Sequence, residues 1–94
     1  MKLNDNGELI LTAGEIEVFN YVKSNGGKVA IEEIASATGR TSRSIGANVT
    51  GLAGGAKLKD YALVGREKVA VEGEEKPVTY VVLTDAGKGF TPAE

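Results

Sequence analysis

The sequence predicts a small α+β domain in which three short helices precede a β-hairpin. Apolar residues recur at the helical period up to residue 52, whereas two valine-rich runs with strand-like alternation follow, over 63–71 and 78–83. Within the helical part, Ala35, Gly39 and Ile45 have the relative spacing of a helix-turn-helix. The first position must be small where two helices cross, the second must allow a left-handed turn, and the third must be apolar.

Length and composition favour one globular domain. A chain of 94 residues can bury one modest core, so we expect a single domain over 1–94, with flexible segments at 1–8 and 89–94. The 41% hydrophobic and 26% charged residues are typical of globular proteins. No apolar run approaches the roughly 18 residues of a membrane span, and the N-terminus has no signal pattern. We therefore expect a cytoplasmic protein without a membrane partner.

The absence of Cys and His argues against most enzyme classes. It removes disulfides, the commonest metal ligands and the usual nucleophile–base pairs. Glu32 and Glu33 fall in the first turn of a predicted helix, where carboxylates stabilise the helix dipole. The glycine-rich stretch 51–55 lacks the Lys-Ser/Thr ending of a phosphate-binding loop. We expect no enzyme activity, no catalytic residue, no metal and no cofactor.

The charges are unevenly distributed along the chain. The whole chain has a net charge of −2, but residues 40–71 contain six basic and two acidic residues, a net charge of +4. The remainder has five basic and eleven acidic residues, a net charge of −6. Positive potential around 40–71 favours an anionic partner such as nucleic acid.

The first helix is predicted over Ala13 to about Ser24. Thr12 and Glu15 have the spacing of a capping box, and Asn25-Gly26-Gly27 ends the helix. Before it, residues 1–7 are rich in turn formers, while 9–11 form a short strand or pack on this helix.

The second and third helices follow a short bridging strand at 28–30. The second helix begins at Ile31 and ends at Gly39, and Thr41 is the predicted N-cap of the third. Ile45, Val49 and Leu52 recur at i, i+4 and i+7, so they form the buried face of the third helix. Glycines 54 and 55 end that helix, and 56–60 add a further turn before the first strand.

The two strands are predicted to form a β-hairpin with a loop over 72–77. In the first strand, Val69 and Val71 point to one side while Arg66 and Lys68 point to the other. Pro77 fits the start of the returning strand because it has no N–H to donate. Residues 84–87 close the domain with a turn or a short helix.

This order of elements is that of a winged helix-turn-helix domain, a three-helix core with a β-hairpin wing. The tracts LTAGE, VAIEEIASATGRTSRSI, REKVAVEG and YVVLTDAGK resemble small bacterial and phage regulators related to the MarR family. The resemblance covers about residues 11–87. It implies a small transcriptional regulator that binds double-stranded DNA, either at a specific sequence or generally. The third helix would lie in the major groove and the hairpin on the neighbouring backbone.

The resemblance also implies which residues contact DNA. The Arg43 guanidinium suits guanine or phosphate, and the Asn48 amide suits adenine. Hydroxyl groups at the start of the third helix suit phosphate oxygens, small residues allow close approach of its backbone, and basic residues beyond it add phosphate contacts. The expected DNA contacts are Arg40, Thr41, Ser42, Arg43, Ser44, Ala47, Asn48, Lys57, Lys59, Arg66 and Lys68.

Three features depart from the family pattern. The connection from the third helix to the wing is longer than usual and contains Lys57, Lys59 and Tyr61, which form either an extra phosphate contact or a solvated loop. The hairpin loop contains Glu72, Glu74 and Glu75 with only Lys76 in compensation, and phosphates repel such a loop. The chain also lacks the long terminal helices through which MarR-type proteins dimerise, so we expect a monomer or a weak homodimer. The alternative is a winged-helix module that binds another protein and not DNA, since fold does not fix function.

Overall fold

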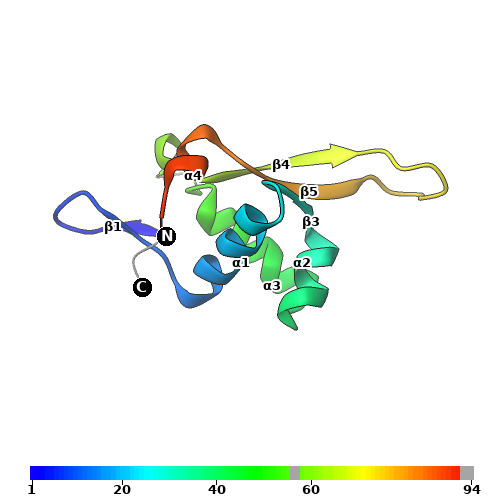
Figure 1. Cartoon of the computed structure of the whole chain (residues 1–94), viewed down its shortest axis with the longest axis horizontal. Coiled ribbons are helices and arrows are strands. Elements are labelled where there is room, and N and C mark those ends of the chain that lie inside the picture. The colour runs from blue at the N-terminus through cyan, green and yellow to red at the C-terminus, as the bar shows by residue number, and fades with distance from the viewer. Residues whose placement is uncertain (56–57, 92–94) are drawn as a thin grey trace.

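The structure is a computed structural model that describes residues 1–55 and 58–91. It is a small α+β fold in which α1, α2 and α3 lie on one side of a three-stranded sheet (Figure 1). The helical elements are α1 (Ala13–Ser24), α2 (Ile31–Thr38), α3 (Ser42–Leu52), the 3-10 helix η1 (Lys59–Tyr61) and α4 (Asp85–Gly89). The strands are β1 (Lys2–Leu3), β2 (Leu9–Ile10), β3 (Lys28–Ala30), β4 (Val64–Val69) and β5 (Val78–Leu83).

The capping box predicted for the first helix is confirmed at the start of α1. The Thr12 hydroxyl accepts a hydrogen bond from the Glu15 backbone N–H at 3.3 Å, and Glu15 Oε1 accepts one from the Thr12 N–H at 2.8 Å. Two N–H groups that the helix leaves without partners are thereby satisfied. Val18, Phe19 and Val22 then form the fully buried face of α1.

The predicted turn between the second and third helices is also confirmed. Gly39 ends α2 with a φ of 72°, a left-handed conformation that glycine adopts without a Cβ clash. Thr41 caps α3 by accepting a hydrogen bond from the Ser44 N–H at 3.1 Å. Together these two residues fix the direction in which α3 leaves the turn.

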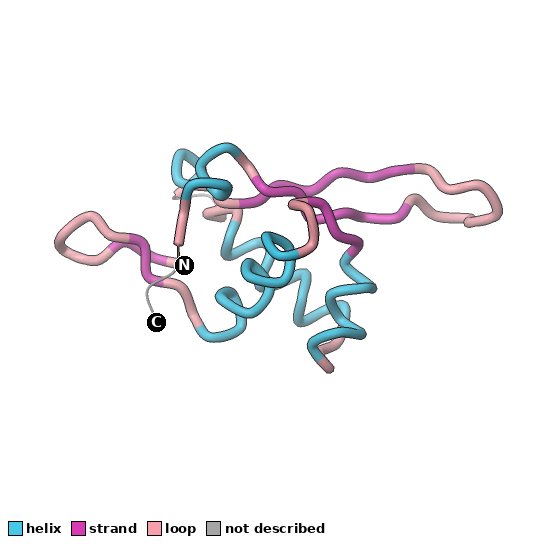
Figure 2. Tube along the Cα trace, viewed as in Figure 1, coloured by secondary structure: helices cyan, strands magenta, loops and turns pink. Residues whose placement is uncertain are grey.

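The three-stranded sheet is antiparallel with the order β3-β5-β4. Val29 pairs with Val81 and Arg66 pairs with Val81 from the other side, so these residues share one face. This face packs against the helices, because Val29, Val64 and Val81 are almost fully buried. The long hairpin β4–β5 extends past the helices as a two-stranded ribbon (Figure 2).

The first strand of the long hairpin is shorter than predicted, and one predicted turn is only partly described. β4 covers 64–69 instead of 63–71. After α3, Gly54 has a φ of 88° and a Cβ there would lie 2.1 Å from the Leu58 carbonyl oxygen, so the chain turns tightly before η1. Residues 56 and 57 of the predicted turn at 56–60 lie outside the described residues.

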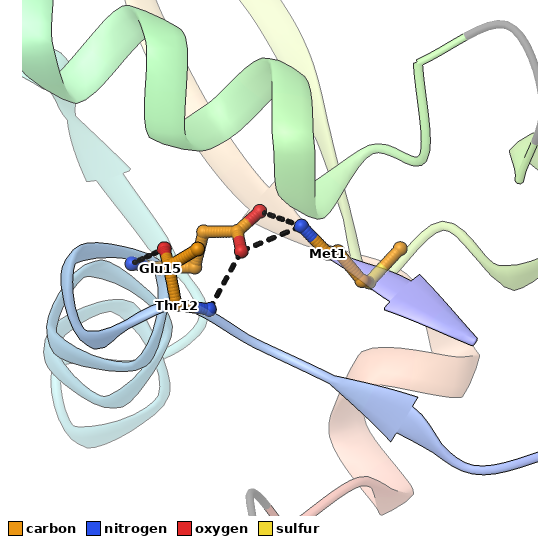
Figure 3. Close-up of polar contacts among 3 residues, drawn as sticks. All are labelled: Met1, Thr12 and Glu15. Atoms are coloured by element: carbon orange, nitrogen blue, oxygen red, sulfur yellow. Dashed lines mark hydrogen bonds and ion pairs between the residues drawn. The ribbon is translucent and has the colours of Figure 1, made fainter. Parts of the chain in front are cut away.

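The N-terminal segment, expected to be flexible over 1–8, forms a second hairpin. β1 pairs with β2, and the Asn4 side chain accepts hydrogen bonds from the backbone N–H groups of Asn6 and Glu8. The Met1 ammonium group donates to both carboxylate oxygens of Glu15 at 2.6 Å (Figure 3). Glu15 is only 3% exposed, so this contact satisfies a buried carboxylate.

The C-terminal segment packs on α1. Thr84 caps α4 by accepting from the Gly87 N–H at 3.0 Å, which confirms the short closing helix. Phe90 meets Phe19 edge to face, with ring centroids 5.7 Å apart, and Lys23 donates to the Phe90 carbonyl. One hydrophobic core thus joins the helices and the sheet.

None of the helices in the described residues has the length and apolar character needed to cross a membrane.

Candidate nucleic-acid interface

The outward face of α3 is exposed. Ile45, Val49 and Leu52 are fully buried on its inner face. On the opposite side Arg43, Ala47 and Thr50, at i, i+4 and i+7, are exposed. The helix contains no Asp or Glu, so no carboxylate of α3 offsets the Arg43 charge.

A side chain from the sheet extends the outward face of α3. Arg66 of β4 donates through Nη2 to the Gly46 carbonyl oxygen at 2.9 Å and to Thr50 Oγ1 at 2.7 Å. The Thr50 hydroxyl donates in turn to the Gly46 carbonyl oxygen at 3.0 Å. A guanidinium has five N–H donors, so most of them stay available to an incoming acceptor.

Strand alternation separates the charges of β4 onto two faces. Arg66 and Lys68 share the face of the buried Val64, the side on which α3 lies. Glu67 points to the other face, where its carboxylate pairs with Lys28 at 3.2 Å, and the Lys28 ammonium lies 5.2 Å from the centre of the Tyr80 ring. The only acid of β4 is therefore directed away from α3.

We call these residues of α3 and β4 the α3–β4 surface, in which Arg66 joins the two elements through its hydrogen bonds to Gly46 and Thr50. It combines the N-terminal turn and outward face of α3 with the two cations of β4. Its members are Ser42, Arg43, Ala47, Thr50, Arg66 and Lys68.

The outward face of α3 does not include three of the residues expected to contact DNA, which are Thr41, Ser44 and Asn48. The Thr41 hydroxyl is used in the cap, and Ser44 is half-buried. Asn48 is half-buried beside α1, because a Cβ added at Gly14 would lie 2.9 Å from its amide oxygen. The Asn48 amide therefore faces the helix packing and not the outward face.

Two of the expected basic residues, Arg40 and Lys59, are also separate from the α3–β4 surface. Arg40 pairs with Glu17 of α1 at 3.1 Å, and its buried Nε has no partner among the described residues. Lys59 is exposed in η1, beyond the C-terminal end of α3, whereas Arg43 lies at the N-terminal end. Lys57 lies outside the described residues.

Thr50 was absent from the residues expected from sequence. Its hydroxyl links Arg66 to α3, so it helps to hold a cation beside the helix. The spacing of Arg43, Ala47 and Thr50 along one helix face could have identified it, since these residues lie opposite the apolar stripe.

Two glycines of α3 lie on opposite flanks of the helix. A Cβ at Gly46 would meet nothing within 4 Å, whereas a Cβ at Gly51 would lie 2.1 Å from Glu15 Oε2. Gly51 therefore makes room for the buried carboxylate. Gly46 has open space where a side chain would be, although its carbonyl oxygen accepts hydrogen bonds from Thr50 and Arg66.

Comparison with protein-family models, with curated proteins and with solved structures finds no match to this chain. Over the parts of the chain that the structure describes, no three or more acidic residues gather closely enough to hold a metal ion. The chemistry of the α3–β4 surface is that of cationic and hydroxyl donors from the helix α3 and the strand β4.

Proposed function

We propose that this chain is a winged helix-turn-helix protein that binds double-stranded DNA, as a small transcriptional regulator. In this proposal α3 enters the major groove and the long hairpin β4–β5 is the wing. Arg43 contacts a base edge or a phosphate, and Arg66 and Lys68 contact the phosphates beside the groove.

The observation that carries the proposal is the charge of the α3–β4 surface. Its cations come from two elements: Arg43 lies on the outward face of α3, Arg66 of β4 is hydrogen-bonded to α3, and Lys68 lies on the same face of β4 as Arg66. The one acid of β4 faces away from them and is paired with Lys28. A protruding helix with cations on its outward side suits the major groove and the phosphates on its rim.

The small residues of α3 also support insertion of this helix. Ala47 lies on the outward face of α3 and Gly46 on a flank, where an added Cβ would meet nothing within 4 Å. Short side chains allow the helix backbone to approach the groove floor closely. A single helix reads only a few base pairs, so we expect modest affinity from a monomer.

The proposal is tested by the salt dependence of binding. Fluorescence anisotropy with a pool of labelled random duplexes gives the dissociation constant between about 50 and 200 mM salt. For Arg43→Gln we expect a loss of about 1–3 kcal/mol in binding free energy and a salt slope smaller by about one.

Lys2→Gln is the matched control, because it removes the same charge from the N-terminal hairpin, at the other end of the molecule from the long hairpin (Figure 1). We expect it to change the dissociation constant less than twofold. Absence of salt-dependent binding by the unmodified chain, or equal losses for the two variants, would contradict the proposal.

A further inference from the structure

An open cleft of about 520 Å³ lies between the loop of the long hairpin and the first turns of α2 and α3. Ile31 and Glu32 line it from α2, Ser42 lines it from α3, and residues 73–79 line it from the hairpin. This volume falls within the range of ligand-binding clefts. The cleft is adjacent to the α3–β4 surface but shares only Ser42 with it.

The lining of the cleft is acidic. It contains the carboxylates of Glu32, Glu74 and Glu75 and a single cation, Lys76. None of these three carboxylates forms an ion pair within residues 1–55 and 58–91. Three unneutralised carboxylates around one cleft repel phosphates and attract cations.

The lining also has apolar walls. Ile31 and Val78 are half-buried, and Pro77 adds a rigid apolar ring between Lys76 and Val78. Lysine and arginine side chains have long aliphatic stems below a charged head group. The stems fit against these walls while the head groups reach the carboxylates at the rim.

We propose that this cleft binds a basic segment of a partner protein, an extended stretch with two or more Lys or Arg residues. Complementary charge selects the partner, and the apolar walls hold the side-chain stems. The inference is independent of DNA binding, because DNA is excluded from the cleft by the same carboxylates.

The test uses the full chain and octalysine as the probe. We expect octalysine to shift the backbone amide resonances of Ile31, Val78 and Thr79, which line the cleft but are not part of the α3–β4 surface, and octaglutamate to shift none of them. With a fluorescein-labelled octalysine, the double variant Glu74→Gln, Glu75→Gln should bind at least fivefold more weakly. These exposed loop positions can accept glutamine without loss of the fold, which the spectrum of the variant verifies.

Glu72→Gln is the matched control, because Glu72 lies in the same loop but does not line the cleft. It should change the affinity less than twofold. Shifts confined to other surfaces, an equal loss for Glu72→Gln, or the same shifts with Mg²⁺ alone would overturn the proposal.

DNA binding is measured on the same variants to separate the two proposals. Loss of two acids should leave duplex affinity unchanged or higher, whereas Arg43→Gln should lower duplex affinity and leave octalysine binding unchanged. If octalysine does not bind, the proposal of DNA binding is unaffected. If DNA does not bind, the proposal for the cleft is unaffected.

Discussion

At the scale of single residues, the two flank glycines of α3 share one helix but have different surroundings. Replacing glycine by alanine within a helix stabilises it by about 1 kcal/mol when the methyl group meets no neighbour. Gly46 has that free space, whereas the Cβ of a residue at 51 would collide with the Glu15 carboxylate. That carboxylate is buried and held by Met1 and Thr12, so it cannot move aside easily.

We therefore predict that Gly46→Ala raises the free energy of unfolding by about 0.5–1 kcal/mol. Gly51→Ala should lower it by more than about 1 kcal/mol, because overpacking a buried site outweighs the gain in helix propensity. Urea denaturation of both variants measures the difference. If α3 enters a DNA groove as proposed, Gly46→Ala also weakens DNA binding in spite of its greater stability. Stabilisation of both variants would refute the assigned role of Gly51.

The Tyr21 hydroxyl provides a second prediction at this scale. It donates to Glu33 Oε2 at 3.3 Å and so links α1 to α2. Loss of hydration raises the pKa of Tyr21 above its ordinary 10.0, and the negative Glu33 carboxylate raises it further. A raised pKa means that folding favours the neutral phenol. The resulting stabilisation is fully present below pH 10 and disappears as the pH rises through the folded-state pKa.

Glu33→Gln should lower the pKa of Tyr21 towards 10.0, since it removes the charge that opposes phenolate formation. NMR titration of ¹³C-labelled tyrosine rings measures this pKa directly. Glu32→Gln is the control, because Glu32 is adjacent in sequence but does not bond the phenol. An unchanged Tyr21 titration in Glu33→Gln would contradict the assignment.

At the scale of elements, the capping box joins α1 to the N-terminal hairpin. Glu15 accepts hydrogen bonds from the Thr12 N–H and from the Met1 ammonium, so one buried carboxylate serves both the helix and the β1–β2 segment. The capping half of this arrangement follows from local spacing. The ion pair between Met1 and Glu15 depends on how the β1–β2 hairpin folds back onto α1, because the two residues are fourteen positions apart in the sequence.

We predict that Glu15→Gln lowers the free energy of unfolding by about 2 kcal/mol, because it weakens a charge-assisted cap and leaves the buried ammonium poorly compensated. Glu17→Gln is the matched control on the same helix. Glu17 pairs with Arg40 at a half-exposed position, where an ion pair contributes less than about 1 kcal/mol. Thermal and urea unfolding compare the two. A cost for Glu15→Gln no larger than that for Glu17→Gln would disprove the buried pairing.

At the scale of the whole molecule, two hairpins project in opposite directions from the helical core (Figure 1). The chain accordingly measures 48 × 25 × 22 Å along its principal axes. The long hairpin carries cations along β4 and acids at its tip, so one arm presents two surfaces of opposite sign. This arrangement underlies both proposals, DNA on the α3–β4 surface and a basic peptide in the neighbouring cleft.

The helices, the caps and the returning strand could be predicted from sequence because local interactions determine them. The apolar period, the Thr12 and Thr41 hydroxyls and Gly39 act within a few residues of the chain. Alternation along β4 likewise predicted that Arg66 and Lys68 share a side. In these cases the interacting groups are neighbours in the sequence.

Contacts between elements were decided only by the tertiary structure. The family resemblance implies Asn48 as a DNA contact, and the structure places its amide beside Gly14 of α1, a neighbour that sequence alone does not predict. The resemblance also left out Thr50, whose role depends on a guanidinium sixteen residues away. The helix that carries a side chain sets the direction in which it points. The packing of the helices on the sheet sets which residues it then contacts. The sequence thus determined the elements and their capping, and the packing decided which charged groups meet.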